Sequence, residues 1–392
     1  MSDREKIVNE TLAIVIEREG IKDAEVIIRP LVTDTVNYTS TLYVITVKSL
    51  GSEDLELFAK VACVGEEIRR DMAFGEIYGR ERLVYGEISK IYDRIQSQSD
   101  IAENEKFVFS KFYASGDGYL QETLILENLA ARGYTTYNRF VSVTWEYASA
   151  AIRELAKLHA LSYAFAERDP EGFDRTMKNA MHPFDGCEGN MFQLYKNTEA
   201  IALEAAPHES REKLRDFFVR ESSVEKFYKN FMPSRRPVLR NYEGLLYSNF
   251  MHKDKGWKIG KIMVDYQTLH SGSAITDLLF FITCGTDGAF RRRHYKQLID
   301  HYYEAFADFL KKLGLDSNKL YPKEEFHDDL KESLPFGLLM AALALPMVLV
   351  EANNAPTFQA DAKLSNFVAK PNEEFRRRFR EFIDDYVEWG VI

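Results

Sequence analysis

The chain has 392 residues, of which 45% are hydrophobic and 29% charged, a composition typical of a globular protein with room for two lobes or domains. Its formal net charge of −10 argues against nucleic acid or an anionic membrane as the main partner. The three cysteines, Cys63, Cys187 and Cys284, are far apart and lack metal-ligand spacing, so we expect free thiols in a reducing compartment.

The first third of the chain has the pattern of a sheet with flanking helices. Apolar positions at helical spacing predict an amphipathic helix over residues 5–18, which Gly20 ends. A charged, helix-favouring segment covers residues 65–95. Strand-forming segments, several of them bounded by turn residues, lie at 24–31, 36–50, 55–63, 107–113 and 122–126. We therefore expect an antiparallel sheet in this region.

The remainder of the chain is mostly helical in pattern, with one strand-rich island. The island covers residues 244–251 and 257–265. Helical periodicity lies at 145–166, 210–230, 291–313 and 324–351. These patterns predict an α+β protein with a sheet-rich N-lobe over residues 1–126, a hinge near Glu127, and a helical C-lobe over residues 127–392.

Neither the longest apolar stretch nor the N-terminal segment predicts a membrane protein. The longest apolar stretch, residues 334–350, contains Gly337 and Pro346 and is short for a bilayer, so we expect a buried helix. The N-terminal residues 1–6 are polar and do not form a signal peptide. Together with the cysteine usage, this predicts a cytoplasmic protein without a membrane span.

Lys60 is the first candidate site residue, because it alternates with apolar residues in a predicted strand. Such a lysine needs a partner or must project into a cleft, although many lysines with this spacing lie on edge strands. Glu76 and Glu81 on the next helix are both candidate partners. A Lys–Glu pair that holds nucleotide phosphates is the arrangement of kinases.

Asn249 and Asp265 stand at the two ends of a predicted hairpin, and Asp265 follows an apolar strand. Hard oxygen ligands in this arrangement suit a magnesium ion that bridges nucleotide phosphates. The alternative reading of Asp265 is a turn or capping carboxylate. Residues 36–40 lie between two strand signals and could bind an anion through a turn. They contain no glycine, and on this evidence alone a plain β-turn is the better explanation.

These motifs, in this order, resemble the ecdysteroid-kinase-like, or CHK-kinase-like, family of the aminoglycoside-phosphotransferase and choline-kinase superfamily. The resemblance runs from about residue 36 to residue 350. It rests on Asn37-Tyr38-Thr39-Ser40, Leu57-Phe58-Ala59-Lys60, Tyr78-x-x-Glu81-x-x-Val84-Tyr85, Leu124-Ile125-Leu126-Glu127-Asn128-Leu129, Leu155-Ala156-Lys157-Leu158-His159, Val264-Asp265-Tyr266-Gln267 and Asp277-Leu278-Leu279-Phe280-Phe281.

The resemblance implies a protein-kinase-like bilobal fold with ATP and Mg²⁺ between the lobes. It favours Glu81 over Glu76 as the partner of Lys60, and it makes Asn249 and Asp265 the metal ligands. His159 becomes a structural residue, and Asp277 braces the catalytic loop. The implied nucleotide-binding residues are Asn37, Tyr38, Ser40, Lys60, Glu81, Glu127 and Leu129, the last two through their backbone near the adenine.

The chain departs from the family at the catalytic loop, which usually reads His-Gly-Asp-x-Trp-x-x-Asn. Counted back from Asn249, the position of the catalytic Asp is Gly244, which has no group that accepts a proton. The first reading is a pseudokinase that binds a nucleotide, a small hydroxylated or hydrophobic molecule in an apolar pocket, or both. In the second, Glu243 substitutes as the base. A third reading is a helical interaction protein that happens to carry a sheet.

Overall fold

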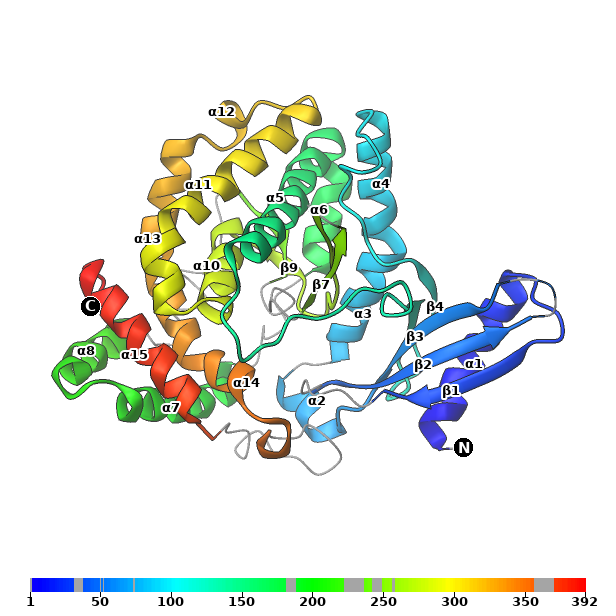
Figure 1. Cartoon of the computed structure of the whole chain (residues 1–392), viewed down its shortest axis with the longest axis horizontal. Helices are drawn as coiled ribbons and strands as arrows, with labels where there is room; N and C mark the ends of the chain where they lie inside the picture. The colour runs from blue at the N-terminus through cyan, green and yellow to red at the C-terminus, as the bar shows by residue number, and fades with distance from the viewer. Residues whose placement is uncertain are drawn as a thin grey trace.

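The computed structural model describes residues 2–31, 38–49, 51, 53–72, 75–180, 188–221, 236–241, 249–255, 258–355 and 370–392. An antiparallel sheet with its helices lies at one end of the molecule, and a larger, mainly helical lobe lies at the other (Figure 1). The protein-kinase-like bilobal fold is therefore confirmed.

The five-stranded sheet has the order β1-β2-β3-β5-β4, with every neighbouring pair antiparallel. Its strands are β1 (Glu25–Pro30), β2 (Ser40–Lys48), β3 (Leu55–Ala62), β4 (Phe112–Gly116) and β5 (Thr123–Glu127). The helices of this half are α1 (Asp3–Arg18), α2 (Glu66–Met72), α3 (Gly75–Leu83), a π-helical turn (Val84–Ile88) and α4 (Ser89–Gln98).

Strand alternation divides the sheet into two faces with different partners. On β3, the fully buried Leu57, Ala59 and Val61 join the apolar face of α1 in one small core. The residue between them, Lys60, points to the opposite face, toward α3 and the helical lobe, because successive side chains of a strand alternate. The sheet therefore delivers a lysine to the interface between the lobes.

The helical lobe is built around α5 (Trp145–Arg168), which packs along α11 (Gly288–Lys312) (Figure 1). All twelve residues of α10 (Ala274–Gly285) are buried. The other helices that the structure describes in this lobe are α6 (Pro170–Asn179), α7 (Glu188–Ala205), α8 (Arg211–Glu221), α12 (Ser317–Leu320), α13 (Lys323–Leu343), α14 (Leu345–Leu349) and α15 (Glu373–Glu388). Short 3₁₀ turns are formed by His208–Ser210 and Ala352–Asn354.

Two short antiparallel pairs complete the helical lobe. One pairs β6 (Val238–Arg240) with β9 (His270–Gly272), and the other pairs β7 (Phe250–Lys255) with β8 (Lys258–Met263). The second pair is the described part of the predicted strand-rich island, of which residues 244–248 lie outside the described residues. Both pairs lie next to the segment that carries Asp265.

Two predicted elements differ from the structure. The predicted strand at 107–113 is wrong over residues 107–111, since β4 begins at Phe112. The side-chain amide of Gln96 forms hydrogen bonds with both backbone groups of Phe107 and so replaces a strand partner. The predicted helix over residues 324–351 is two helices, broken at Ala344 just before Pro346 at the start of α14. Within the described ranges, no helix combines the length and apolar character that a bilayer crossing needs.

Candidate nucleotide site

Lys60 is the centre of a buried three-charge cluster between the lobes. Its ammonium lies 3.0 Å from both carboxylate oxygens of Glu81 and 3.0 Å from Oδ1 of Asp265. Lys60 and Glu81 are 8% and 2% exposed, whereas the Asp265 side chain is 37% exposed and so faces solvent. One end of the cluster is therefore enclosed by protein, and the other is open to solvent.

Glu81 reaches Lys60 from α3, one turn before the chain changes to a π-helical turn. Its carboxylate also accepts a hydrogen bond from the backbone N–H of Tyr266. Glu76, the other candidate from the sequence, is exposed on the same helix. Isolated π-helical turns are frequent at functional sites, and this one directly follows the helix that supplies Glu81.

The charges in the cluster perturb one another. Burial alone would lower the pKa of Lys60, but the negative charges of Asp265 and Glu81 have the larger effect together, so the pKa is raised. Burial raises the pKa of Glu81 to about 7, with Lys60 opposing the rise and Asp265 adding to it. Lys60 therefore keeps its charge at neutral pH, while Glu81 lies close to its own titration point.

Asp265 has a backbone conformation that few residues other than glycine adopt, with φ +66°. The Nδ2 of Asn241 donates to the carbonyl of Asp265 at 2.9 Å, and Thr268 donates to Oδ1 of Asn241. Asn241 is itself fully buried. This amide therefore fixes the left-handed turn that aims Asp265 at Lys60.

Asp277, at the start of α10, anchors the same network in the core of the helical lobe. Its Oδ2 accepts from the backbone N–H of Asn241 at 2.9 Å and lies 3.2 Å from Nε2 of His159. The other ring nitrogen of His159 lies 2.8 Å from the hydroxyl of Tyr302. His159 is completely buried, and its contacts are those of a structural residue.

Asn249 and Asp265 lie at the same open end of the β7–β8 pair. Phe250 pairs with Met263, and the N–H of Val264 donates to the carbonyl of Asn249 at 2.9 Å. An amide oxygen and a carboxylate are hard ligands, and Mg²⁺ in nucleotide sites commonly uses one or two such groups together with phosphates and water. The exposed Asp265 and the neighbouring Asn249 thus suit a magnesium ion.

The predicted hinge offers one backbone donor. The carbonyl of Leu129 accepts from the N–H groups of Arg132 and Tyr134, whereas its own N–H makes no hydrogen bond to any residue that the structure describes. The Glu127 side chain is occupied, because it accepts from the backbone N–H of Lys111 and pairs with Arg132. Adenine at this hinge would therefore meet the Leu129 N–H rather than the Leu129 carbonyl.

The predicted phosphate-loop residues lie partly within the described structure. Asn37, and likewise Glu243 and Gly244 of the catalytic loop, lie outside the described residues. Ser40 is buried at the first position of β2, opposite Ala62. The hydroxyl of Tyr38 donates to the carbonyl of Met347 in the helical lobe, and burial raises its pKa.

The profile of the Ecdysteroid kinase-like family matches residues 35–315 of the chain. The chain belongs to this family. No curated protein sequence matches it significantly. Solved structures similar to this family member include a microcompartment-associated aminopropanol kinase, with 11% identity, a TM-score of 0.47, and coverage of 96% of this chain and 98% of the other.

Two further solved structures are aminoglycoside phosphotransferases. The GDP complex of aminoglycoside 2'-phosphotransferase-IIIa is 8% identical with a TM-score of 0.40, covering 83% of this chain and 97% of the other. The GDP and kanamycin complex of APH(2")-IIIa is 10% identical with a TM-score of 0.38, covering 85% of this chain and 98% of the other.

Sequence reasoning missed one contact in the ecdysteroid kinase-like site. The hydroxyl of Thr39 donates to Oε1 of Gln267 at 2.8 Å and so joins the N-lobe to the segment that carries Asp265. Both residues stand inside motifs that the sequence singles out, Asn37-Tyr38-Thr39-Ser40 and Asp265-Tyr266-Gln267. The two motifs could be recognised in the sequence, but the hydrogen bond between them could not.

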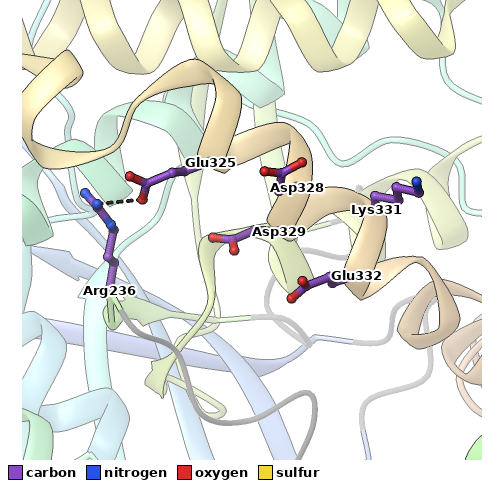
Figure 2. Close-up of a pocket in the computed structure, with 6 residues that line it drawn as sticks. All are labelled: Arg236, Glu325, Asp328, Asp329, Lys331 and Glu332. Carbon is purple, nitrogen blue, oxygen red and sulfur yellow. Dashed lines mark hydrogen bonds and ion pairs between the residues drawn. The ribbon is translucent and has the colours of Figure 1, made fainter.

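A separate pocket of about 510 Å³ lies on the helical lobe. Figure 2 shows its carboxylates projecting from α13, with Arg236 paired to Glu325. Its lining consists of Arg236, Glu325, Asp328, Asp329, Lys331 and Glu332. The described lining is charged and so does not match the apolar acceptor pocket that the family resemblance implies. None of the candidate nucleotide-binding residues that the structure describes is part of it.

Proposed function

We propose that the chain binds a nucleotide with Mg²⁺ between its lobes and a small hydroxylated or hydrophobic molecule beside it, with little transfer of phosphate. The observation that carries the proposal is the buried Lys60 between Glu81 and the half-exposed Asp265. A buried cation held by one enclosed and one accessible carboxylate suits the exchange of the accessible partner for phosphate oxygens. The N-lobe would end at residue 126 and the C-lobe would begin at residue 127.

In this proposal each described residue has a defined task. Lys60 donates to the phosphates while Glu81 keeps its side chain in place. Asp265 and Asn249 supply oxygen ligands to magnesium, which when bound neutralises phosphate charge. The N–H of Leu129 donates to a ring nitrogen of adenine. Tyr38 and Ser40 lie at the predicted phosphate loop.

The limited transfer follows from Gly244. A general base typically contributes on the order of 10²- to 10⁴-fold to a rate. Kinase transition states are loose, and positioning and metal charge supply much of the remaining rate enhancement. A chain without the base would therefore bind its ligands and turn them over slowly at most.

A second candidate function is an active ATP-dependent phosphotransferase in which Glu243 serves as the base. The observation that favours it is the hydrogen bond from the N–H of Asn241 to Asp277. This bond fixes the backbone two residues before Glu243, at the start of the predicted catalytic loop. ATP-dependent phosphorylation of a steroid-like or other small alcohol would then fall sharply in Glu243→Gln. In the favoured reading, Glu243→Gln leaves a low rate unchanged, whereas Gly244→Asp raises it.

Thermal unfolding with and without nucleotide tests the binding proposal. Because ATP with Mg²⁺ would bind only the folded chain, we expect a rise in the melting temperature, and ligand at about 100 times its Kd stabilises by about 2.7 kcal/mol. Lys60→Met should remove the rise. Lys48→Met is the matched control, because Lys48 is a partly exposed lysine on β2 of the same sheet.

Millimolar ATP that leaves the melting temperature of the unmodified chain unchanged would refute nucleotide binding. A rise that persists in Lys60→Met would show that ATP binds elsewhere. The small-molecule half is tested separately, by screening hydroxylated steroids, choline-like alcohols and sugars in the same assay.

A further inference from the structure

Besides the Lys60–Asp265 ion pair, a neutral contact also crosses from the sheet to the segment that carries Asp265. The hydroxyl of Thr39 donates to Oε1 of Gln267 at 2.8 Å. The carbonyl of Thr39 accepts in turn from the N–H of Cys63 and from the hydroxyl of Tyr78. Thr39 is therefore fixed to the end of β3 and to α3, and its hydroxyl has a defined direction.

The nitrogen end of the Gln267 amide differs from its oxygen end in having no partner among the described residues. Gln267 is 6% exposed, and its Nε2 is buried without a hydrogen-bond acceptor among the described residues. Nearly all buried polar side-chain atoms in folded proteins have a partner, because a buried donor without one is destabilising. An amide nitrogen in this state is suited to a ligand that brings an acceptor.

The position of Gln267 narrows the class of acceptor. It lies two residues after Asp265, whose carboxylate is 3.0 Å from the ammonium of Lys60. Its partner Thr39 precedes Ser40, at the root of the predicted phosphate loop. The amide is therefore held between the groups that surround the proposed phosphates. A phosphate oxygen is a strong acceptor and would satisfy its N–H₂ group.

We propose that Gln267 is a nucleotide-binding residue with two functions. Its amide oxygen holds Thr39, and with it the root of the phosphate loop, against the metal-binding segment. Its amide nitrogen donates to a phosphate oxygen of the bound nucleotide. This inference rests on the proposed nucleotide binding and adds a residue that recognises phosphate rather than the base.

Three variants and two ligands separate these functions. Gln267→Glu keeps an oxygen for Thr39 and removes the N–H₂ donor, whereas Gln267→Met removes both groups without adding charge. Thr39→Val removes only the contact between the lobes. Affinities for ATP with Mg²⁺ and for adenosine, which lacks phosphates, are measured by titration calorimetry on the full chain.

We expect both Gln267 variants to bind ATP at least about tenfold more weakly than the unmodified chain, with unchanged affinity for adenosine. Thr39→Val should weaken ATP binding less than either of them. Equal losses for ATP and adenosine would make Gln267 a purely structural residue, and unchanged ATP affinity in Gln267→Met would exclude it from the site. If the unmodified chain binds neither ligand, the proposed function fails, and this inference fails with it.

Discussion

Replacing Glu81 by glutamine should change how stability depends on pH. In the folded chain, burial raises the pKa of Glu81 from its ordinary value of 4.5 to about 7, despite the attraction of Lys60. Between these two values the folded chain holds a proton that the unfolded chain has released. The free energy of unfolding contributed by this group therefore falls as pH rises, and it is largest below pH 4.5.

The size of the effect follows from the two pKa values. Between about pH 5.5 and about pH 8, the ionisation of Glu81 should lower the free energy of unfolding by about 2 kcal/mol. Lys60 does not contribute to this change, because the whole interval lies below its ordinary pKa of 10.5 and its folded pKa is higher still. Glutamine has the same shape as glutamate and does not ionise, so Glu81→Gln should lack this loss.

The assay is urea unfolding of the unmodified chain and of Glu81→Gln at the two pH values. Other titrating groups cancel in the comparison between the chains, so the unmodified chain should lose about 2 kcal/mol relative to the variant as pH rises. Glu76→Gln is the matched control, because Glu76 is exposed on the same helix, and it should behave as the unmodified chain does. Parallel pH profiles for Glu81→Gln and the unmodified chain would refute the reasoning.

Three further predictions concern single contacts. Arg69 is 4% exposed and donates to both carboxylate oxygens of Glu122, at 2.6 and 2.8 Å. Arg69→Lys should therefore lower the free energy of unfolding by about 1–3 kcal/mol. The control is Arg82→Lys, which changes an exposed ion pair and should not lower it in this way. A Cβ at Gly337 would overlap the Tyr386 hydroxyl, so Gly337→Ala should lower the free energy of unfolding, measured with urea, by about 1–3 kcal/mol. Adding Tyr386→Phe to the same chain should recover part of this loss of stability. Asparagine tolerates the positive φ of Asp265, so Asp265→Asn should keep the fold while calorimetry shows ATP binding that no longer depends on Mg²⁺.

Local patterns in the sequence predicted the part of the site that depends on one strand or one hairpin. Alternation in β3 indicated that Lys60 faces away from the apolar residues beside it, and the structure has Leu57, Ala59 and Val61 on the α1 side. The hairpin pattern also brought Asn249 and Asp265 to two strand ends, which the β7–β8 pair places at one edge. Their roles in nucleotide and metal binding stay predictions.

The contacts that sequence reasoning missed depend on the tertiary fold. Thr39 and Gln267 are 228 positions apart, and no local period relates them. Phe107 looks like a strand residue, but the side chain of Gln96 takes both its backbone hydrogen bonds. By contrast, α15 could have been predicted, because its buried Phe375, Phe379, Phe382, Ile383 and Tyr386 have helical spacing.

The contacts that hold Asp265 in place come from described residues outside positions 242–248. A buried carboxylate such as Asp277 is tolerated only with partners, and it has them in the N–H of Asn241 and the ring of His159. Asn241 then passes the constraint to the backbone of Asp265 through its side-chain amide. This chain of contacts runs from the core of the helical lobe to the segment that carries Asp265. We therefore expect that the proposed nucleotide binding does not require the catalytic base whose predicted position is Gly244.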